Sequence, residues 1–492
     1  MTDEPRSPKM TRRSLLAATA AGSTGAAVAL GVTLAPPVAT EAVAQDAISG
    51  IRRSVNALTL NGRTLSAYRR GVAVMKRRPF TDPTSWSYQA AIHGFQGLPP
   101  VGMPQDMVRN MTRCEHRTND NSAPRHFLPW HRLYLHFFER IVRDASGDPD
   151  FMLPYWDYSA DNGNRLPLAF RWPDDFTNSL YEQARNTFTL DINRGDPLPF
   201  SVTTDQAAMM QRKYVSFSDS VEGTPHGTVH VAVGGNGLMS QFHTAALDPI
   251  FWLHHCNVDR MWSRWLIDQP GARNPVDDPQ WMNANFTFFD ETGMQQTASV
   301  ADTLDPATLG YTYENNRPFF GGFAPFVVAS GAESGVIPET LAASEGVTLS
   351  GTRKRVAAEA QGAAAESGSA ELFITDISNL ESRPVILRMN GISFDEVPGI
   401  LYEVYVNLPE GTDASPQSPY YAGLLAPFGF DKNKGIVDLD ITGVLNRQIE
   451  ADEFVGGVLT VDFVPAGLPD DGAESGIIIP DLQMDSLEIV RE

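Results

Sequence analysis

Residues 248–259 read DPIFWLHHCNVD, and this stretch decides how the first half of the chain is expected to fold. Proline in the first turn, directly after an aspartate, is a helix start signal. Large apolar side chains then continue the helical pattern as far as Trp265. On this helix His255 and Asp259 stand four residues apart, so the carboxylate can brace the helix that carries the imidazole. His254 points elsewhere, and there we expect a structural imidazole bonded to a backbone carbonyl.

A second pair of histidines upstream has the spacing of metal ligands. His226 and His230 stand at i and i+4, so a helix would present both imidazoles on one face. All ten histidines fall within the stretch from His93 to His255, whereas incidental surface histidines would be scattered over the C-terminal third as well. With only two cysteines in the chain, this clustering points to copper, zinc or iron rather than to a sulfur-rich centre.

Another histidine-bearing helix is predicted from Trp130 to about Asp144, where apolar residues recur at helical spacing. His131 stands at its start, while His136 lies off that face and is expected to be structural. His93 and His116, further upstream, are two more candidate ligands. The residues therefore predict a mainly helical domain that contains a multi-histidine metal site.

These segments resemble the type-3 copper proteins, the family of tyrosinases, catechol oxidases and haemocyanins. Residues 248–259 meet the copper-B signature D-P-x-F-x-x-x-H-x-x-x-D in full, and residues 127–139 meet the copper-A signature F-L-P-W-H-R…E. The resemblance implies two copper ions that act on O₂ and a small phenolic substrate. It implies the copper-A ligands His93, His116 and His131 and the copper-B ligands His226, His230 and His255.

One ligand position departs from the family pattern, because Ser122 stands where the second copper-A histidine is usual. His116 is favoured, since Cys114-x-His116 resembles the fungal and molluscan pattern in which the cysteine is bonded to the histidine ring. The alternative ligand is His126, which would otherwise be a neighbouring or entrance residue. The resemblance thus implies a thioether between Cys114 and His116 and leaves Cys256 as a buried thiol. A Cys114–Cys256 disulfide is the other interpretation.

Two further site residues follow from the resemblance. Glu222, four residues before His226, is similar in place to a glutamate that orients a water above the coppers; a solvated loop carboxylate is the alternative. Gly227 stands where enzymes that hydroxylate monophenols well often carry asparagine. We therefore expect oxidation of o-diphenols and o-aminophenols, with weaker hydroxylation of monophenols. The alternative functions are an O₂ carrier like haemocyanin and, less favoured, a copper-free structural protein.

The N-terminus carries the features of an export signal. Residues 11–16 read TRRSLL, a twin-arginine pattern, and an alanine-rich run leads to the A-x-A site at residues 42–44. Residues 1–44 are therefore predicted to be a signal peptide, and the mature protein to be secreted or otherwise extracytoplasmic. The Gly, Thr and Pro content of this run fits a transmembrane helix poorly, so no membrane association is expected after cleavage. A net charge of −21 argues against nucleic acid as a partner.

The rest of the chain divides into three expected parts. Residues 45–320 would form the catalytic domain, an α-helical bundle that includes a segment, 277–320, resembling plant polyphenol oxidases; Tyr311-Thr-Tyr313 looks like their tyrosine motif. Residues 321–370 are mostly small and polar and are predicted to be a cleavable linker. Short strand-like runs at residues 372–374, 385–387, 401–406 and 459–464 predict an all-β sandwich over 371–492. In plant relatives such a domain covers the copper site, so the enzyme is expected to be latent until the linker is cut. The sequence leaves the oligomeric state open.

Overall fold

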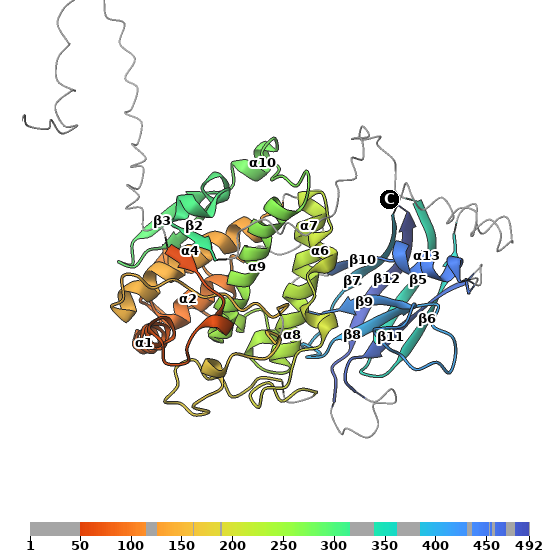
Figure 1. Cartoon of the computed structure of the whole chain (residues 1–492), viewed down its shortest axis with the longest axis horizontal. Coiled ribbons are helices and arrows are strands. Elements are labelled where there is room, and N and C mark those ends of the chain that lie inside the picture. The colour runs from red at the N-terminus through yellow and green to blue at the C-terminus, as the bar shows by residue number, and fades with distance from the viewer. Residues whose placement is uncertain are drawn as a thin grey trace, which may run out of the picture. The chain divides into compact units, whose positions relative to one another are not determined.

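The computed structural model describes residues 50–114, 125–160, 162–186, 189–314, 339–361, 384–430, 435–451, 453–454, 458–468 and 478–491. The predicted signal peptide and His116 lie outside these residues. All elements described below belong to one compact unit, Ala47–Glu492. Within it we call residues 50–314 the helical domain and residues 339–491 the β domain. Figure 1 colours the helical domain from red to green and the β domain from blue-green to blue.

The helical domain consists of helices joined by turns and by longer irregular segments. Its α-helices are α1 (Arg63–Arg77), α2 (Trp86–His93), α3 (Gln105–Arg109), α4 (Phe127–Ser146), α5 (Phe200–Thr203), α6 (Gln206–Met209), α7 (Tyr214–Val221), α8 (Thr228–Gly234), α9 (Ile250–Asp268) and α10 (Pro279–Met282). A π-helical turn, η3 (Glu222–Gly227), joins α7 to α8. The 3₁₀ turns are η1 (Val55–Ala57), η2 (Leu168–Phe170), η4 (Leu238–Ser240), η5 (Ala245–Leu247), η6 (Val300–Thr303) and η7 (Pro306–Leu309).

The two helices predicted from the sequence form the centre of this domain. α9 begins at Ile250, directly after Pro249, and the backbone N–H of Ile250 donates to the carboxylate of Asp248. The same carboxylate forms a buried ion pair with Arg185, which fixes the start of the helix. α4 packs against α9 through large apolar side chains. The rings of Phe138 and Trp252 stack between the two helices with planes within 6° of parallel.

The helical domain also contains two small two-stranded sheets. Strand β1 (Gly50–Arg52) pairs in parallel with β4 (Tyr311–Tyr313), and β2 (Asn285–Phe289) forms a hairpin with β3 (Gln295–Ser299). The first sheet therefore ties the last described strand of the helical domain to the first. None of the helices among the described residues is long and apolar enough to cross a membrane.

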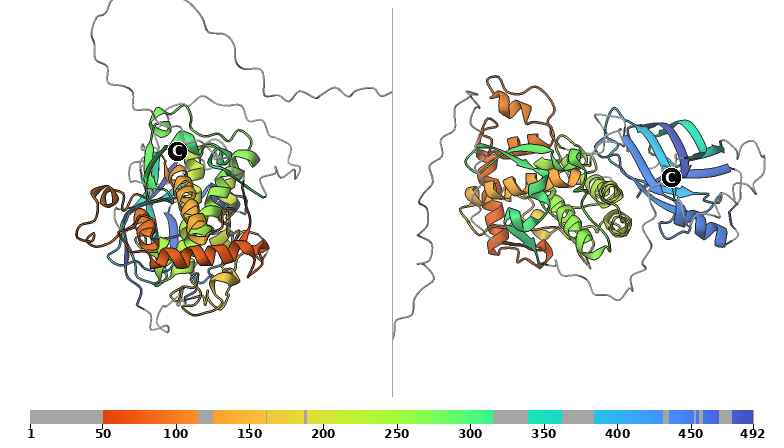
Figure 2. Two further views of the ribbon diagram at one scale, coloured as in Figure 1. Left: turned by 90° about the vertical axis from the view of Figure 1, so that its left-hand side faces the viewer. Right: turned by 90° about the horizontal axis from the view of Figure 1, so that it is seen from above.

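The β domain is a single antiparallel sheet of eight strands with one helix. The strands are β5 (Glu339–Leu349), β6 (Lys354–Ala360), β7 (Val385–Ile392), β8 (Tyr402–Val406), β9 (Tyr421–Leu425), β10 (Gly435–Asp440), β11 (Val458–Pro465) and β12 (Leu482–Arg491), and the helix is α13 (Thr442–Glu450). Their spatial order is β10-β7-β12-β5-β6-β11-β8-β9. The sheet curves (Figure 2), so the side chain of Leu439 in β10 lies against Gly423 in β9. The predicted fold class, a mainly helical domain followed by a β domain, is confirmed.

The boundary of the β domain differs from the prediction. Residues 339–360, placed in the linker 321–370 by their composition, form strands β5 and β6 of the sheet. Their inward side chains are small or isolated, such as Ala342, Val347 and Ala358, so the apolar alternation is faint in the sequence. The predicted strands near Val385, Tyr402 and Leu459 are present as β7, β8 and β11. The run predicted at residues 372–374 lies outside the described residues.

Candidate metal centre

Five of the six predicted copper ligands converge at the middle of the helical domain. They come from five elements and are almost completely buried: His93 at the end of α2, His131 in α4, His226 in η3, His230 in α8 and His255 in α9. The imidazole of His255 is the central one, since its ring centroid lies 4.3 Å from that of His131 and 4.9 Å from that of His226. His93 completes the group, with its centroid 5.9 Å from that of His131.

Backbone carbonyls fix the orientation of four of these imidazoles. A carbonyl can only accept a hydrogen bond, so the ring nitrogen that faces it must carry the proton. In each case that nitrogen is Nδ1, which sets Nε2 as the atom that faces a metal, and the carbonyl partner of a metal-bound imidazole is a common arrangement. The Nδ1–H groups of His93, His131, His226 and His230 donate to the backbone carbonyl oxygens of Phe242 (3.1 Å), Phe127 (2.8 Å), Glu222 (3.0 Å) and Met239 (2.8 Å), respectively.

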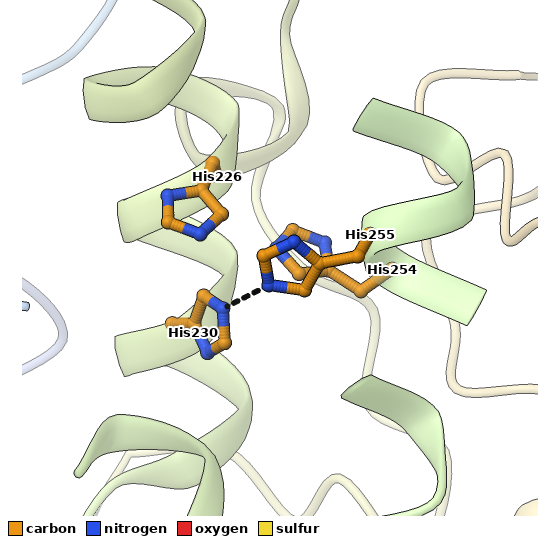
Figure 3. A group of neighbouring side chains, drawn as sticks. All are labelled: His226, His230, His254 and His255. Atoms are coloured by element: carbon orange, nitrogen blue, oxygen red, sulfur yellow. Dashed lines mark hydrogen bonds between the residues drawn. The ribbon is translucent and has the colours of Figure 1, made fainter. Parts of the chain in front are cut away.

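Two groups of side chains have the geometry of metal sites among the described residues. One contains His226, His230, His254 and His255, and the other contains His93, Cys114 and His131; within each, the candidate ligand atoms lie within 4.8 Å of one another. Figure 3 shows the first group, with rings from two helical segments turned into the space between them. The Nε2 atoms of His230 and His255 are 3.2 Å apart.

Burial favours the neutral form of the imidazoles of His230 and His255. Desolvation lowers the pKa of His230 and of His255 well below the ordinary value, and neighbouring imidazoles lower each of them further. His254 shares this environment, and its pKa is lowered for the same reasons. A neutral imidazole is the form that binds copper or zinc, so the cluster is ready for a metal ion near neutral pH.

The group that contains the predicted copper-A ligands His93 and His131 also contains a cysteine, Cys114. Cys114 Sγ lies 3.4 Å from Nε2 of His131, on the side of the ring where a metal would bind. Neither cysteine is part of a disulfide, so the alternative of a Cys114–Cys256 disulfide is wrong. Cys256 is buried, with Sγ 3.8 Å from the hydroxyl of Tyr313, and burial raises the pKa of its thiol to about 12.

His126 lies apart from both clusters. Its Nε2 contacts the carbonyl oxygen of Trp281 at 3.3 Å, and its ring packs at the edge of Phe286. Burial lowers the pKa of His126. His136 is also remote from the centre, and burial together with nearby arginines lowers its pKa to about 3. The structural role predicted for His136 agrees with this position.

Glu222 and Gly227, the two further predicted site residues, lie in η3, the turn that also carries the predicted copper-B ligand His226. Glu222 is 7 % exposed, and its backbone carbonyl holds the His226 ring. It is therefore not the solvated loop carboxylate of the alternative interpretation. Gly227 is buried, and a Cβ there would lie 3.3 Å from the carbonyl oxygen of Glu222 and 3.6 Å from Cβ of Ala426. A side chain at position 227 would thus lie between the metal cluster and the β domain.

Asp259 braces its helix, but not through the ring of His255. Its carboxylate accepts from Arg132 on α4 and from the hydroxyls of Tyr311 and Tyr313 on β4. Arg52 on β1 lies beside it, with its guanidinium 3.5 Å above the ring of Tyr311. All these groups are buried, so Asp259 links the two ligand-bearing helices to the β1–β4 sheet. The tyrosine motif found in the sequence supplies two of its partners.

A side chain from the β domain reaches the cluster. Phe428, in the loop that follows β9, stacks on the imidazole of His230 with centroids 3.9 Å apart and is 6 % exposed. Its ring also meets the ring of His226 edge-on at 5.5 Å. Sequence reasoning missed this residue, because no local pattern distinguishes it from other loop phenylalanines. His254, expected to be a structural imidazole, lies in the same group of side chains as the three predicted copper-B ligands.

Comparisons with known proteins agree with this geometry. Residues 83–198 and 177–267 match the common central domain of tyrosinase, residues 275–319 match the polyphenol oxidase middle domain, and residues 338–477 match a domain of unknown function. The chain is 36% identical to tyrosinase HcTyr1 of Hahella sp. (strain CCB-MM4) over 307 residues, which cover 52% of this chain and 62% of that protein. It is 28% identical to the chloroplastic polyphenol oxidase of Malus domestica over 440 residues, which cover 80% of this chain and 72% of that protein.

A solved structure shares the fold of both domains. Latent aurone synthase, a polyphenol oxidase, superimposes with a TM-score of 0.57 at 24% identity, over 91% of this chain and 90% of that one. The two clusters of imidazole ligands suit two copper ions, the metal for which neutral imidazole is a favoured donor. Residues 83–267 therefore belong to the family of the tyrosinase central domain, whose centre is a pair of copper ions, and a polyphenol oxidase middle domain follows at residues 275–319.

Proposed function

We propose that this protein is a copper-dependent phenol oxidase that converts o-diphenols to o-quinones with O₂. Oxidation of o-aminophenols and weaker hydroxylation of monophenols belong to the same proposal. The observation that carries it is the convergence of five buried imidazoles, four of which are oriented by backbone carbonyls. The named relatives are oxidases, which favours turnover over reversible O₂ binding of the haemocyanin kind.

The chemistry balances without another reagent. Each o-diphenol gives up two electrons and two protons, and each O₂ takes up four of both to form two water molecules. Two diphenols are therefore oxidised for each O₂. When bound, the copper pair supplies the electron transfer between phenol and O₂ and makes the phenolate accessible near neutral pH. His93, His131, His226, His230 and His255 would hold it, with His116 as the proposed sixth ligand.

The surroundings of the site would direct substrate and protons. Phe127 and Phe251 pack against the imidazoles, with Phe251 centred 4.2 Å from His255, and exclude water from the centre. Glu222 is proposed to orient a water or take up a phenolic proton, since its carboxylate is buried next to the copper-B segment. Gly227 offers no amide to hold that water, which is the reason for expecting weak hydroxylation of monophenols.

We also propose that the β domain keeps the enzyme latent. The support is the stacking of Phe428 on His230, which covers one ligand face with a side chain that a phenolic ring would otherwise meet. A second support is the backbone contact at Gly399, whose Cβ position lies 2.7 Å from the carbonyl oxygen of Gly235 beyond α8. Activation would follow cleavage between Glu314 and Glu339, the span that joins the two domains.

Oxygen uptake tests both proposals together. The full-length protein, loaded with copper, is compared with protein cut between residues 314 and 339, using catechol, o-aminophenol and tyrosine as substrates. Uptake with catechol at one O₂ for two diphenols supports the oxidase, and a marked rise after cleavage supports latency. Equal rates before and after cleavage would remove latency alone. Reversible O₂ binding without quinone formation would remove the oxidase.

Export and the thioether complete the proposal. The twin-arginine pattern at residues 11–16 and the A-x-A site at residues 42–44 support export of a folded, copper-loaded protein to an extracytoplasmic location.

The thioether between Cys114 and His116 is supported by the Cys-x-His pattern. Mass spectrometry of the peptide that contains both residues tests it, because the bond removes two hydrogen atoms. An unmodified peptide from copper-loaded protein would argue against the thioether.

A further inference from the structure

The copper-B end holds one imidazole more than its three predicted ligands. His226, His230, His254 and His255 form the group, and Figure 3 shows all four rings facing the space between η3–α8 and α9. Every candidate ligand atom in this group lies within 4.8 Å of the others. His254 therefore meets the same distance condition as the three predicted copper-B ligands.

The rings of His254 and His255 face different histidines of the candidate metal centre. Adjacent helical residues project about 100° apart, so the two rings take different sides of α9. His255 faces the copper-A half, where its ring stacks on that of His131 at 4.3 Å. His254 instead faces the pair His226 and His230, with ring centroids at 5.5 Å and 4.8 Å. His254 thus belongs to the copper-B end alone, whereas His255 lies between both ends.

No hydrogen bond explains the burial of His254. Among the described residues, neither of its ring nitrogens has a partner that meets hydrogen-bond geometry, and the side chain is fully buried. The backbone of His226 is near enough to act on the ring, but it does not supply a bond of ordinary geometry. The hydroxyl of the adjacent Tyr158 is buried as well, with its ring 5.6 Å from that of His254. A buried imidazole without a partner is unfavourable, and a metal ion is one partner that removes the penalty.

We propose that His254 is an auxiliary copper ligand, so that His226, His230 and His254 can hold one copper ion without His255. The ion would be captured by these three imidazoles during loading and then transferred to His255, which brings it next to the copper-A ion. This inference rests on the proposed copper centre. It goes beyond it by assigning a role to a histidine that the family signature leaves out.

Copper stoichiometry tests the proposal without an activity assay. Four variants, His254→Asn, His255→Asn, the double variant and His136→Asn, are loaded with copper, freed of excess ion and analysed for metal per chain. His136→Asn is the matched control, since it removes a half-buried histidine that belongs to neither group of candidate ligands. We expect two copper ions in the wild type, in the control and in His255→Asn, and one in the double variant. Loss of the second ion from His255→Asn to the extent seen in the double variant would overturn the proposal.

If the variants do not fold, a second measurement on the wild-type protein tests the proposal. The wild-type protein is crystallised with one equivalent of copper, and the position of the ion is determined. Density for copper bonded to His226, His230 and His254 supports the auxiliary role, and an ion bonded only to His226, His230 and His255 at every loading overturns it. A wild type that binds no copper at all would instead contradict the proposed function, so the two failures are distinguishable.

Discussion

The phenyl ring of Phe428 lies face to face with the imidazole of His230, with centroids 3.9 Å apart and planes within 9° of parallel. The two side chains come from different domains, so this contact joins the β domain directly to a metal-binding residue. Stacked aromatic pairs contribute about 0.5–1.5 kcal/mol beyond the area that they bury. The β domain therefore contacts the candidate metal centre through one identifiable side chain.

Replacing Phe428 by alanine is expected to raise catechol oxidation by the full-length enzyme. Loss of the stack would favour the uncovered state by about 0.5–1.5 kcal/mol, which corresponds to a rise of up to about tenfold. Initial oxygen-uptake rates before cleavage give the measurement. The matched control is Phe430→Ala, because Phe430 is partly buried and packs against the core of the β domain. A rise of equal size in both variants would show that general loosening of the β domain, and not Phe428, uncovers the site.

Replacing Gly227 by asparagine is expected to increase tyrosine hydroxylation relative to catechol oxidation. The new amide would lie next to the carbonyl oxygen of Glu222 and could help Glu222 to hold a water. Because Ala426 leaves little room at this position, the comparison is made in enzyme from which the β domain has been removed. The ratio of the two kcat/KM values is measured against Gly227→Ala, which adds bulk without an amide. An unchanged ratio would contradict this role of position 227.

Replacing Asp259 by asparagine is expected to destabilise the helical domain strongly. The carboxylate lies between two buried arginines, and removing one partner of a buried ion pair costs about 3–5 kcal/mol. Tyr311→Phe, which removes one hydrogen bond to the same carboxylate, should cost about 1 kcal/mol. Urea unfolding of the metal-free proteins measures both. Similar small losses in the two variants would show that Asp259 is not the centre of the network.

His136 is expected to make the metal-free protein sensitive to acid. Burial lowers the pKa of His136 to about 3 in the folded state, while the unfolded value is about 6.5. The unfolded chain therefore binds the extra proton first, so stability is present above about pH 6.5 and falls as the pH drops towards 3. At pH 5 the loss from this group is about 2 kcal/mol. His136→Gln should reduce the difference in unfolding free energy between pH 7 and pH 5 by that amount, and an unchanged difference would contradict the prediction.

The parts that could be predicted were those governed by local pattern. His226 and His230 share a helical segment, and the start signal at Asp248 fixes where His255 falls, so spacing along the chain was enough to place them. The backbone groups that orient the rings could not be predicted in this way. Met239 and Phe242 act through backbone carbonyls, and any residue type could supply those.

The errors and omissions also have physical reasons. The sequence of strands β5 and β6 resembles a linker, because small residues such as Ala342 and Ala358 fill inward positions of these strands. The contact of Phe428 depends on how two domains pack, which no periodicity encodes. For Asp259, the i, i+4 spacing indicated the right helix but not the direction of the carboxylate, which turns to Arg132 and away from His255.

The pairing of β4 with β1 has a consequence for what remains after cleavage. Glu314, the last described residue before the proposed cut, accepts hydrogen bonds from the backbone N–H of Ser54 and the hydroxyl of Tyr155. Just before it, Tyr313 is fastened to the carboxylate of Asp259. A protease that cuts after this point would leave a chain end that is already anchored in the interior. The released catalytic fragment would therefore keep its new terminus from unravelling and would need no further folding to begin turnover.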